Sequence, residues 1–208
     1  MTVISICEIT GATWGEYVLS GASLGGTRGR FCTADKAASS NIGTNYPIPV
    51  PTSGYNNSYA KSIFLKATSF TDTKMYNFRF YTDGGGYDTG VETWVGQSGQ
   101  TDASKMQNGL PSSQYTQATG TEGTSGDLFW DIGGHYYSGI KATGVVKASA
   151  NAFSFTSASP LWLTSGNSTN ILDSDGYSFG VAMQVRVDNS ANSGTYAAEN
   201  YTIKYDVI

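Results

Sequence analysis

The acidic side chains are the residues of this chain whose chemistry could support hydrolysis. A glycosidase needs two carboxylates beside the scissile bond, one as proton donor and the other as base or nucleophile. The candidates are Glu92, Asp127, Asp131, Asp173 and Glu199. Asp127 and Asp131 are four residues apart beside turn formers, but 16 acidic residues in a chain of 208 produce such spacings by chance. The spacing therefore gives no specific support to a hydrolase.

Nucleophilic catalysis lacks a recognisable motif. The chain has one histidine, His135, and no Gly-x-Ser-x-Gly sequence of the kind that presents a catalytic serine. A single histidine that follows two glycines is typical of a surface turn. We therefore expect a protein that is not an enzyme and that uses no cofactor.

Two short acidic sequences have the composition of a calcium loop. Asp173 and Asp175 alternate before a glycine, but the acidic ligand expected further along such a loop is missing. Asp83 and Asp88 flank three glycines and have the same two interpretations. The alternative in both places is a tight turn in which the Asp side chain accepts a hydrogen bond from nearby backbone.

The two cysteines, Cys7 and Cys32, also have two interpretations. Both lie in apolar surroundings and could be buried thiols that pack as small hydrophobic side chains. They could instead form a disulfide that ties the N-terminal strand to its neighbour. Metal binding would need further ligands, which the sequence does not offer beside them.

Four aromatic residues could stack on sugar rings if they are exposed: Trp94, Trp162, Tyr136 and Tyr137. Trp94 lies in an expected strand, and Trp162 lies in the short apolar run that follows Pro160. These positions favour the core for both tryptophans, with glycan contact as the alternative.

The composition is typical of short strands joined by polar turns, as in extracellular adhesins, viral surface proteins and sugar-binding modules. Only 13% of the residues are charged, whereas Gly (26) and Tyr (14) are abundant. The net charge of −4, without a run of Lys or Arg, argues against nucleic-acid binding. No apolar stretch is long enough for a membrane span, and residues 1–10 do not resemble a secretory signal.

The clearest structural signal is strict two-residue alternation near the C-terminus. From Tyr177 to Val187 every second residue is apolar, and the pattern returns from Tyr201 to Val207. Side chains of a strand alternate between faces, so each segment predicts a strand with one buried face. The intervening turn formers, from Asp188 to Gly194, suggest that these two strands form an antiparallel pair.

Similar alternation predicts the rest of the fold. We expect strands over residues 1–10, 29–33 and 91–95, and a second pair formed by 59–67 and 74–82. In the last of these, Tyr76, Phe78 and Phe80 are predicted to point inward. Short strands separated by turn clusters favour a single all-β domain, an antiparallel β-sandwich of the jelly-roll or immunoglobulin-like kind.

Two long segments interrupt the strands, at about 43–58 and 96–126. The first contains prolines at the alternate positions 47, 49 and 51, which excludes a central strand there because proline lacks the backbone donor. We expect both segments to be extended arms that contact partner proteins. The residues expected to make those contacts are Tyr46, Pro47, Pro49, Pro51, Met106, Leu110 and Tyr115.

The C-terminal sequence resembles a known group of proteins. A long strand ends at Asp188, Ala191-Asn-Ser-Gly-Thr-Tyr196 forms a turn, and Tyr201-Thr-Ile-Lys-Tyr-Asp206 forms a final strand. This ending is similar to that of small β-sandwich structural proteins of tailed phages and archaeal viruses. Asn77-Phe-Arg-Phe80 and Leu110-Pro-Ser-Ser113 also fit their layout.

The resemblance implies a role on a virus particle and no catalytic residues. It predicts capsid decoration as a cement protein, or a place in the tail or fibre. The expected partners are other virion proteins, the major capsid protein or the tail, and further copies of the chain, for example in a trimer. The alternative is a carbohydrate- or receptor-binding module on a tail fibre or adhesin.

Overall fold

A computed structural model describes residues 2–10, 15–18, 29–34, 41–58, 61–97, 147–163, 172–178 and 180–208. This part of the chain is almost entirely β structure, with one four-residue helix, α1 (Ile42–Asn45), and one 3-10 turn, η4 (Ala152–Ser154). The strands are β1 (Val3–Thr10), β2 (Gly15–Val18), β3 (Tyr55–Asn57), β4 (Lys61–Thr68), β5 (Met75–Thr82), β6 (Val91–Gln97), β7 (Lys147–Asn151), β8 (Leu161–Trp162), β9 (Gly176–Tyr177), β10 (Val181–Asp188) and β11 (Tyr201–Val207).

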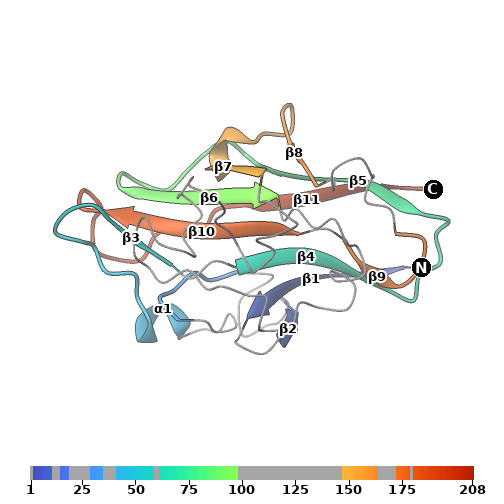
Figure 1. The fold of residues 1–208 in the computed structure, drawn as a ribbon, viewed down its shortest axis with the longest axis horizontal. Helices are drawn as coiled ribbons and strands as arrows, with labels where there is room; N and C mark the ends of the chain where they lie inside the picture. The colour runs from blue at the N-terminus through green and yellow to red at the C-terminus, as the bar shows by residue number, and fades with distance from the viewer. Residues whose placement is uncertain are drawn as a thin grey trace.

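The strands form two antiparallel sheets. The larger sheet has the order β2-β1-β4-β10-β6-β7, with β3 added to β10 and β9 added to β4. The smaller sheet has the order β11-β5-β8. Figure 1 shows β10 between β6 and β4, with both termini at the end of the molecule opposite α1 and β3. The expected all-β antiparallel sandwich is confirmed.

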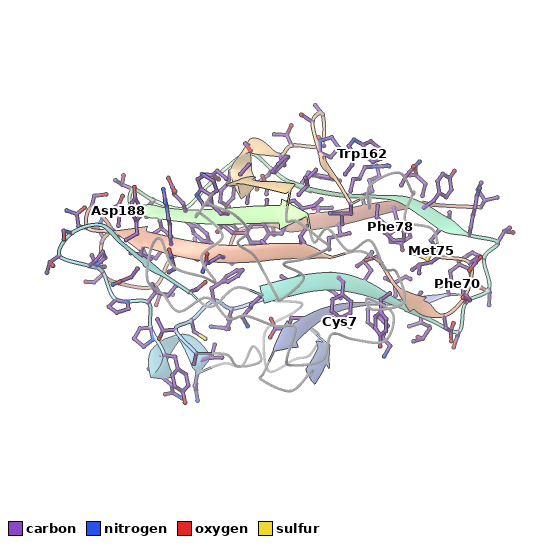
Figure 2. All side chains as sticks on the ribbon, in the orientation of Figure 1. Cys7, Phe70, Met75, Phe78, Trp162 and Asp188 are labelled. Atoms are coloured by element: carbon purple, nitrogen blue, oxygen red, sulfur yellow. The ribbon has the colours of Figure 1, made fainter. Side chains whose placement is uncertain are left out.

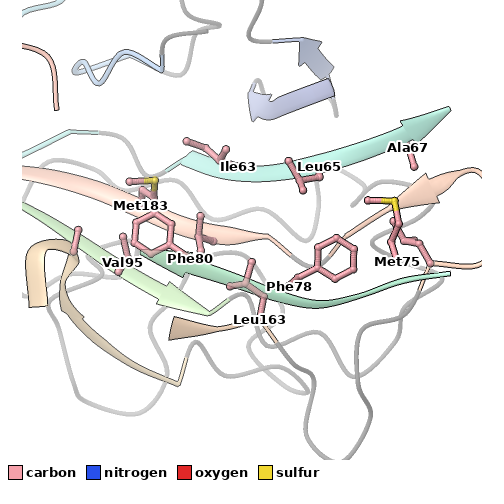
Figure 3. Close-up of a cluster of buried hydrophobic side chains, with 12 residues drawn as sticks. Ile63, Leu65, Ala67, Met75, Phe78, Phe80, Val95, Leu163 and Met183 are labelled. Carbon is pink, nitrogen blue, oxygen red and sulfur yellow. The ribbon is translucent and has the colours of Figure 1, made fainter. Parts of the chain in front are cut away.

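The inner faces of the two sheets share one hydrophobic core. Ile63, Leu65 and Met183 from the larger sheet pack with Phe78 and Phe80 from the smaller one (Figure 3). Phe78 and Phe80 are at most 1% exposed, and burial of each side chain contributes about 1.5–3 kcal/mol. Strands of both sheets therefore contribute every second side chain to the core between them.

The expected pairing of the last two strands is wrong. β10 lies in the larger sheet, where β6 pairs with it from Val181 to Val187, and β4 and β3 occupy its other edge. No edge of β10 remains for β11, which pairs with β5 in the smaller sheet. The segment between them, residues 189–200, therefore passes from one sheet to the other.

The expected pairing of the 59–67 and 74–82 segments is wrong for the same reason. β1 and β10 occupy the two edges of β4 at Ile63, which pairs with both Glu8 and Val181. β5 faces β4 across the core instead of pairing with it in one sheet. Both strands have the alternation of half-buried strands, and that pattern is the same for paired strands and for strands that pack face to face.

Irregular residues also shift the predicted faces of two strands. Asn77 has a positive φ of 56°, and the register of β5 against β11 changes beside it, so Met75 is buried in the core and Tyr76 is not. The long strand expected from Tyr177 is interrupted after that residue, whose ring packs against Phe64 outside the main core cluster. Residues 29–33 are described but form no strand.

Candidate functional site

The proline-rich segment from Tyr46 to Thr52 lies extended at the end of the sandwich where α1 and β3 are found (Figure 1). Ile48 anchors it from beneath, because this side chain packs against the buried valines of β6 and β10. The Asn56 amide donates to the Pro49 carbonyl over 2.8 Å, and the Thr33 amide donates to the Tyr46 carbonyl over 3.1 Å. The expected loop at 43–58 is thus partly regular, since it contains the end of α1 and all of β3.

The outer side of this segment is exposed. Pro47 and Pro49 are exposed, Pro51 and Tyr46 are half-buried, and Val50 is 37% exposed. Prolines restrict the backbone in the unbound state, so a partner that binds here has little chain entropy to remove. The segment has the properties of a rigid contact surface.

A second surface lies on the outer face of the smaller sheet. Arg79 of β5 pairs with Trp162 of β8 on one side and with Lys204 of β11 on the other. Directly opposed residues of antiparallel strands share a face, so these three side chains form a row across the sheet. Tyr81 and Thr202 form the next pair along. The expectation that Trp162 belongs to the core is wrong, because its side chain is 46% exposed (Figure 2).

Arg79 is fixed at the centre of this row. Its two terminal nitrogens donate to the two oxygens of Asp206 over 2.9 and 3.1 Å, and the Asn77 amide donates to the same carboxylate. The guanidinium carbon lies 5.5 Å from the centroid of the Trp162 ring, close enough for a cation–π contact. The hydrogen bonds from Arg79 and Asn77 hold the pKa of Asp206 below its usual range.

Trp94 belongs to a different cluster on the larger sheet. Its indole nitrogen and the Arg186 Nε both donate to one oxygen of Glu92, each over 2.9 Å. Arg186 stacks on Tyr55 at 3.7 Å and lies 5.4 Å from the Trp94 ring. Trp94 is half-buried rather than a core residue, and these contacts engage both the indole nitrogen and Glu92.

A buried ion pair lies inside the sandwich. The Lys61 ammonium on β4 is 3.1–3.2 Å from both oxygens of Glu8 on β1, and the two side chains are 2% and 0% exposed. Both side chains are on the inner face, which Ile63 defines because it belongs to the core. Lys61 is two residues before Ile63 on β4, and Glu8 pairs directly with Ile63, so both share its face. Removal of either partner would leave a buried charge without its oppositely charged partner, so the pair constrains how β1 packs on β4.

The three carboxylates considered for hydrolysis that the structure describes, Glu92, Asp173 and Glu199, have separate surroundings. Glu92 accepts from Trp94 and Arg186, and Asp173 is exposed in a turn. Glu199 is half-buried, and burial together with the charge of Asp83 raises its pKa. Glu199 thus has an acidic neighbour, but Asp83 is not one of the carboxylates considered for hydrolysis.

The raised pKa of Glu199 predicts a pH-dependent effect of the substitution Glu199→Gln. An acid whose pKa is higher in the folded state destabilises the fold as pH rises above its unfolded value, here 4.5. Glu199→Gln should therefore raise the melting temperature at pH 7, by at most about 2 °C because the group is near solvent. The gain should vanish at about pH 3, where the carboxyl is protonated in both states.

Thermal unfolding followed by circular dichroism at the two pH values checks this expectation. Asp72→Asn, which removes the same charge from an exposed turn, is the control. An equal gain from Glu199→Gln at both pH values would contradict a protonation origin.

The acidic loop sequences are ordinary turns where the structure describes them. One oxygen of Asp175 accepts from the Phe70 amide over 2.7 Å, and the Ser174 hydroxyl donates to Asp173. An Asp83 oxygen accepts from the Gly85 amide over 3.0 Å. Within the described ranges, no group of three or more His, Cys, Asp or Glu side chains gathers to hold a metal ion.

Neither cysteine forms a disulfide and both are buried, so the disulfide alternative is wrong. Cys7 pairs with Phe64 across β1 and β4 and packs with that ring. The Cys32 thiol donates to the Ala34 carbonyl over 3.1 Å. Each sulfur thus has its own local environment, which agrees with the interpretation as buried thiols.

Several residues singled out from the sequence lie outside the described part of the chain. They are Met106, Leu110, Tyr115, Asp127, Asp131, His135, Tyr136 and Tyr137, together with the arm from 98 to 126. The expectations for these residues stay predictions.

Sequence reasoning missed the side chains that surround Trp162. Arg79, Lys204 and Asp206 occupy the polar positions of alternating strands, which is the only signal the sequence offers for them. The pairing of β5 with both β8 and β11 places them together. Glu8 and Lys61 gave no signal at all, since 53 residues separate them.

Comparison with protein-family models, curated proteins and solved structures found no match to this chain. No helix in the described ranges is both long and apolar enough to cross a membrane.

Proposed function

We propose that the protein is a non-enzymatic structural component of a virus particle that acts through protein–protein contacts at the particle surface. Capsid decoration as a cement protein is the specific role we favour. The bound partner is a neighbouring virion protein or another copy of the chain. The C-terminal sequence that resembles phage and archaeal virus proteins supports this proposal.

The exposed proline segment is the observation that carries the proposal. A cement protein bridges neighbouring subunits, and it needs a rigid body with a preformed surface that projects from it. The sandwich supplies the body, and the Ile48 anchor fixes the segment to it. Pro47, Pro49 and Val50 then present an apolar and largely donor-free surface, which suits a protein partner.

The substitution Val50→Asp tests this contact. It places a charge at the centre of the exposed segment, where the side chain has room, so the fold should be retained. We expect association with the particle, or between copies of the chain, to weaken by at least about tenfold, as for a central interface residue. Light scattering measures the native mass, and co-sedimentation with purified particles measures attachment.

Val3→Asp is the matched control, because Val3 is 50% exposed and is the first residue of β1. The N-terminus, which precedes β1, lies at the end of the molecule opposite α1 and β3 (Figure 1). It should leave both measurements unchanged. Unimpaired association of the Val50→Asp variant would remove the segment from the contact. Absence of the protein from purified particles, by mass spectrometry, would overturn the virion role itself.

A further inference from the structure

The outer face of the smaller sheet carries an exposed indole beside fixed polar groups. Trp162 is the residue concerned, and its neighbours in the sheet hold it in a defined place: Leu161 pairs with Phe80, and the Leu163 amide donates to the Phe78 carbonyl over 2.9 Å. An exposed large aromatic side chain on such a short, well-anchored strand presents a flat apolar surface to solvent. Trp162 is therefore available for stacking.

The charges around Trp162 are unbalanced. β5, β8 and β11 carry two cations and one carboxylate, namely Arg79, Lys204 and Asp206. Asp206 is engaged with Arg79 through both oxygens. Among the described residues, no hydrogen bond or ion pair holds the exposed Lys204 ammonium. The face is thus locally basic, whereas the whole chain has a net charge of −4.

The spacing of these groups is set by the sheet. Neighbouring strands lie about 4.8 Å apart, so Lys204 and Trp162, which are two strands apart, have backbones separated by roughly 10 Å. The hydroxyls of Tyr81 and Thr202 belong to the next pair on the same face. A ligand that stacks on the indole can therefore meet a positive charge and hydroxyl groups without any change in the backbone.

We propose that this face binds an acidic saccharide, a sugar that carries a carboxylate or sulfate group. The apolar face of a sugar ring packs on the Trp162 indole, and the anionic group pairs with the Lys204 ammonium. Tyr81 and Thr202 exchange hydrogen bonds with the sugar hydroxyls. The contact between the Arg79 guanidinium and the Trp162 ring keeps the indole in place, and the hydrogen bonds to Asp206 keep Arg79 in place.

A saccharide fits this face better than an acidic protein segment does. The exposed apolar surface in the row is one indole, and the groups beside it are hydroxyls and the exposed Lys204 ammonium. Protein interfaces of ordinary affinity instead bury a contiguous apolar centre of several residues. Such a sugar-binding face goes beyond a structural role, since it would give the particle a way to attach to a surface that carries acidic glycans.

Titration calorimetry of the whole chain with matched sugars tests the proposal. The probes are sialyllactose against lactose, and tetragalacturonate against maltotetraose. We expect an acidic sugar to bind more tightly than its neutral counterpart, with affinity that falls as salt is added. Trp162→Ala should weaken binding by at least about tenfold and Lys204→Ala by several-fold, whereas Trp162→Phe should retain most of it.

Lys66→Ala is the charge-matched control, because Lys66 is on β4 of the other sheet. It should bind as the unaltered protein does, and thermal melts should show that all variants are folded. Three results would each overturn the proposal: no binding of either acidic sugar up to about 10 mM, full binding by Trp162→Ala, or equal loss in Lys66→Ala. Equally tight binding of polyglutamate would assign the face to an acidic protein segment instead.

Discussion

Replacing Lys61 with methionine should destabilise the protein by about 3–5 kcal/mol, the usual cost of breaking a buried ion pair. Glu8 is fully buried on the inner face of β1, and the Lys61 ammonium contacts both of its oxygens. Without Lys61 the carboxylate must stay charged while buried without the ammonium, take up a proton, or move β1 away from β4. Each of these outcomes lowers the free energy of unfolding.

Urea unfolding followed by tryptophan fluorescence measures this loss. The double variant Glu8→Leu with Lys61→Met is the informative control, because apolar side chains of similar volume can replace a buried pair at little cost. We expect it to recover most of the stability that Lys61→Met loses. If Lys61→Met unfolds within about 1 kcal/mol of the unaltered protein, the pair is not buried as described.

Replacing Phe80 with alanine should cost about 3–5 kcal/mol, as for a large aromatic side chain removed from a packed core. Phe80 is fully buried, its ring lies 6.0 Å from that of Tyr201, and it packs against side chains of both sheets. The cavity left by the phenyl ring would lie between the sheets, where neither can collapse without moving the other.

Tyr81→Ala is the matched control for Phe80→Ala, because Tyr81 is the next residue of β5 on the opposite face. Its removal should cost less than about 1 kcal/mol. Chemical unfolding of the two variants compares the two faces of one strand. Similar losses from the two variants would mean that Phe80 and Tyr81 are not on a buried and an outer face of β5.

The two proposed surfaces lie on different parts of the molecule. The proline segment is at the end of the sandwich beside α1 and β3, whereas Trp162 is on the outer face of the smaller sheet (Figures 1 and 2). Val50→Asp should therefore leave sugar binding intact, and Trp162→Ala should leave association with the particle intact. The two proposals can fail independently.

The sequence by itself determined the class of fold and the location of most strands. Two-residue alternation placed β4, β5, β6, β10 and β11 because burial of one face is a local requirement that each strand records in its own residues. The strand expected over 91–95, for example, is β6, and its Val91 and Val95 are buried on the inner face. The sequence also predicted that the proline segment is not part of a central strand, since each proline restricts the backbone and lacks the N–H donor.

Only the tertiary structure decided which strands are partners. Alternation shows that a strand has a buried face, but it does not indicate which strands lie beside it or cover that face. The pattern therefore could not show that β10 and β11 belong to different sheets. The edges of β10 are taken by β3, β4 and β6, which come from distant parts of the sequence. The crossing of residues 189–200 between sheets follows from that competition for edges.

The same limit applies to both candidate surfaces and to the buried pair. Trp162 stands in an apolar run, yet it is exposed because β8 places Leu161 and Leu163 against the sandwich and leaves the residue between them outside. Lys204, Arg79 and Trp162 form a row, and Glu8 meets Lys61, only because strands far apart in sequence are neighbours in space. Residue type and spacing fixed what each strand could bury, and the pairing of distant strands decided which side chains came together.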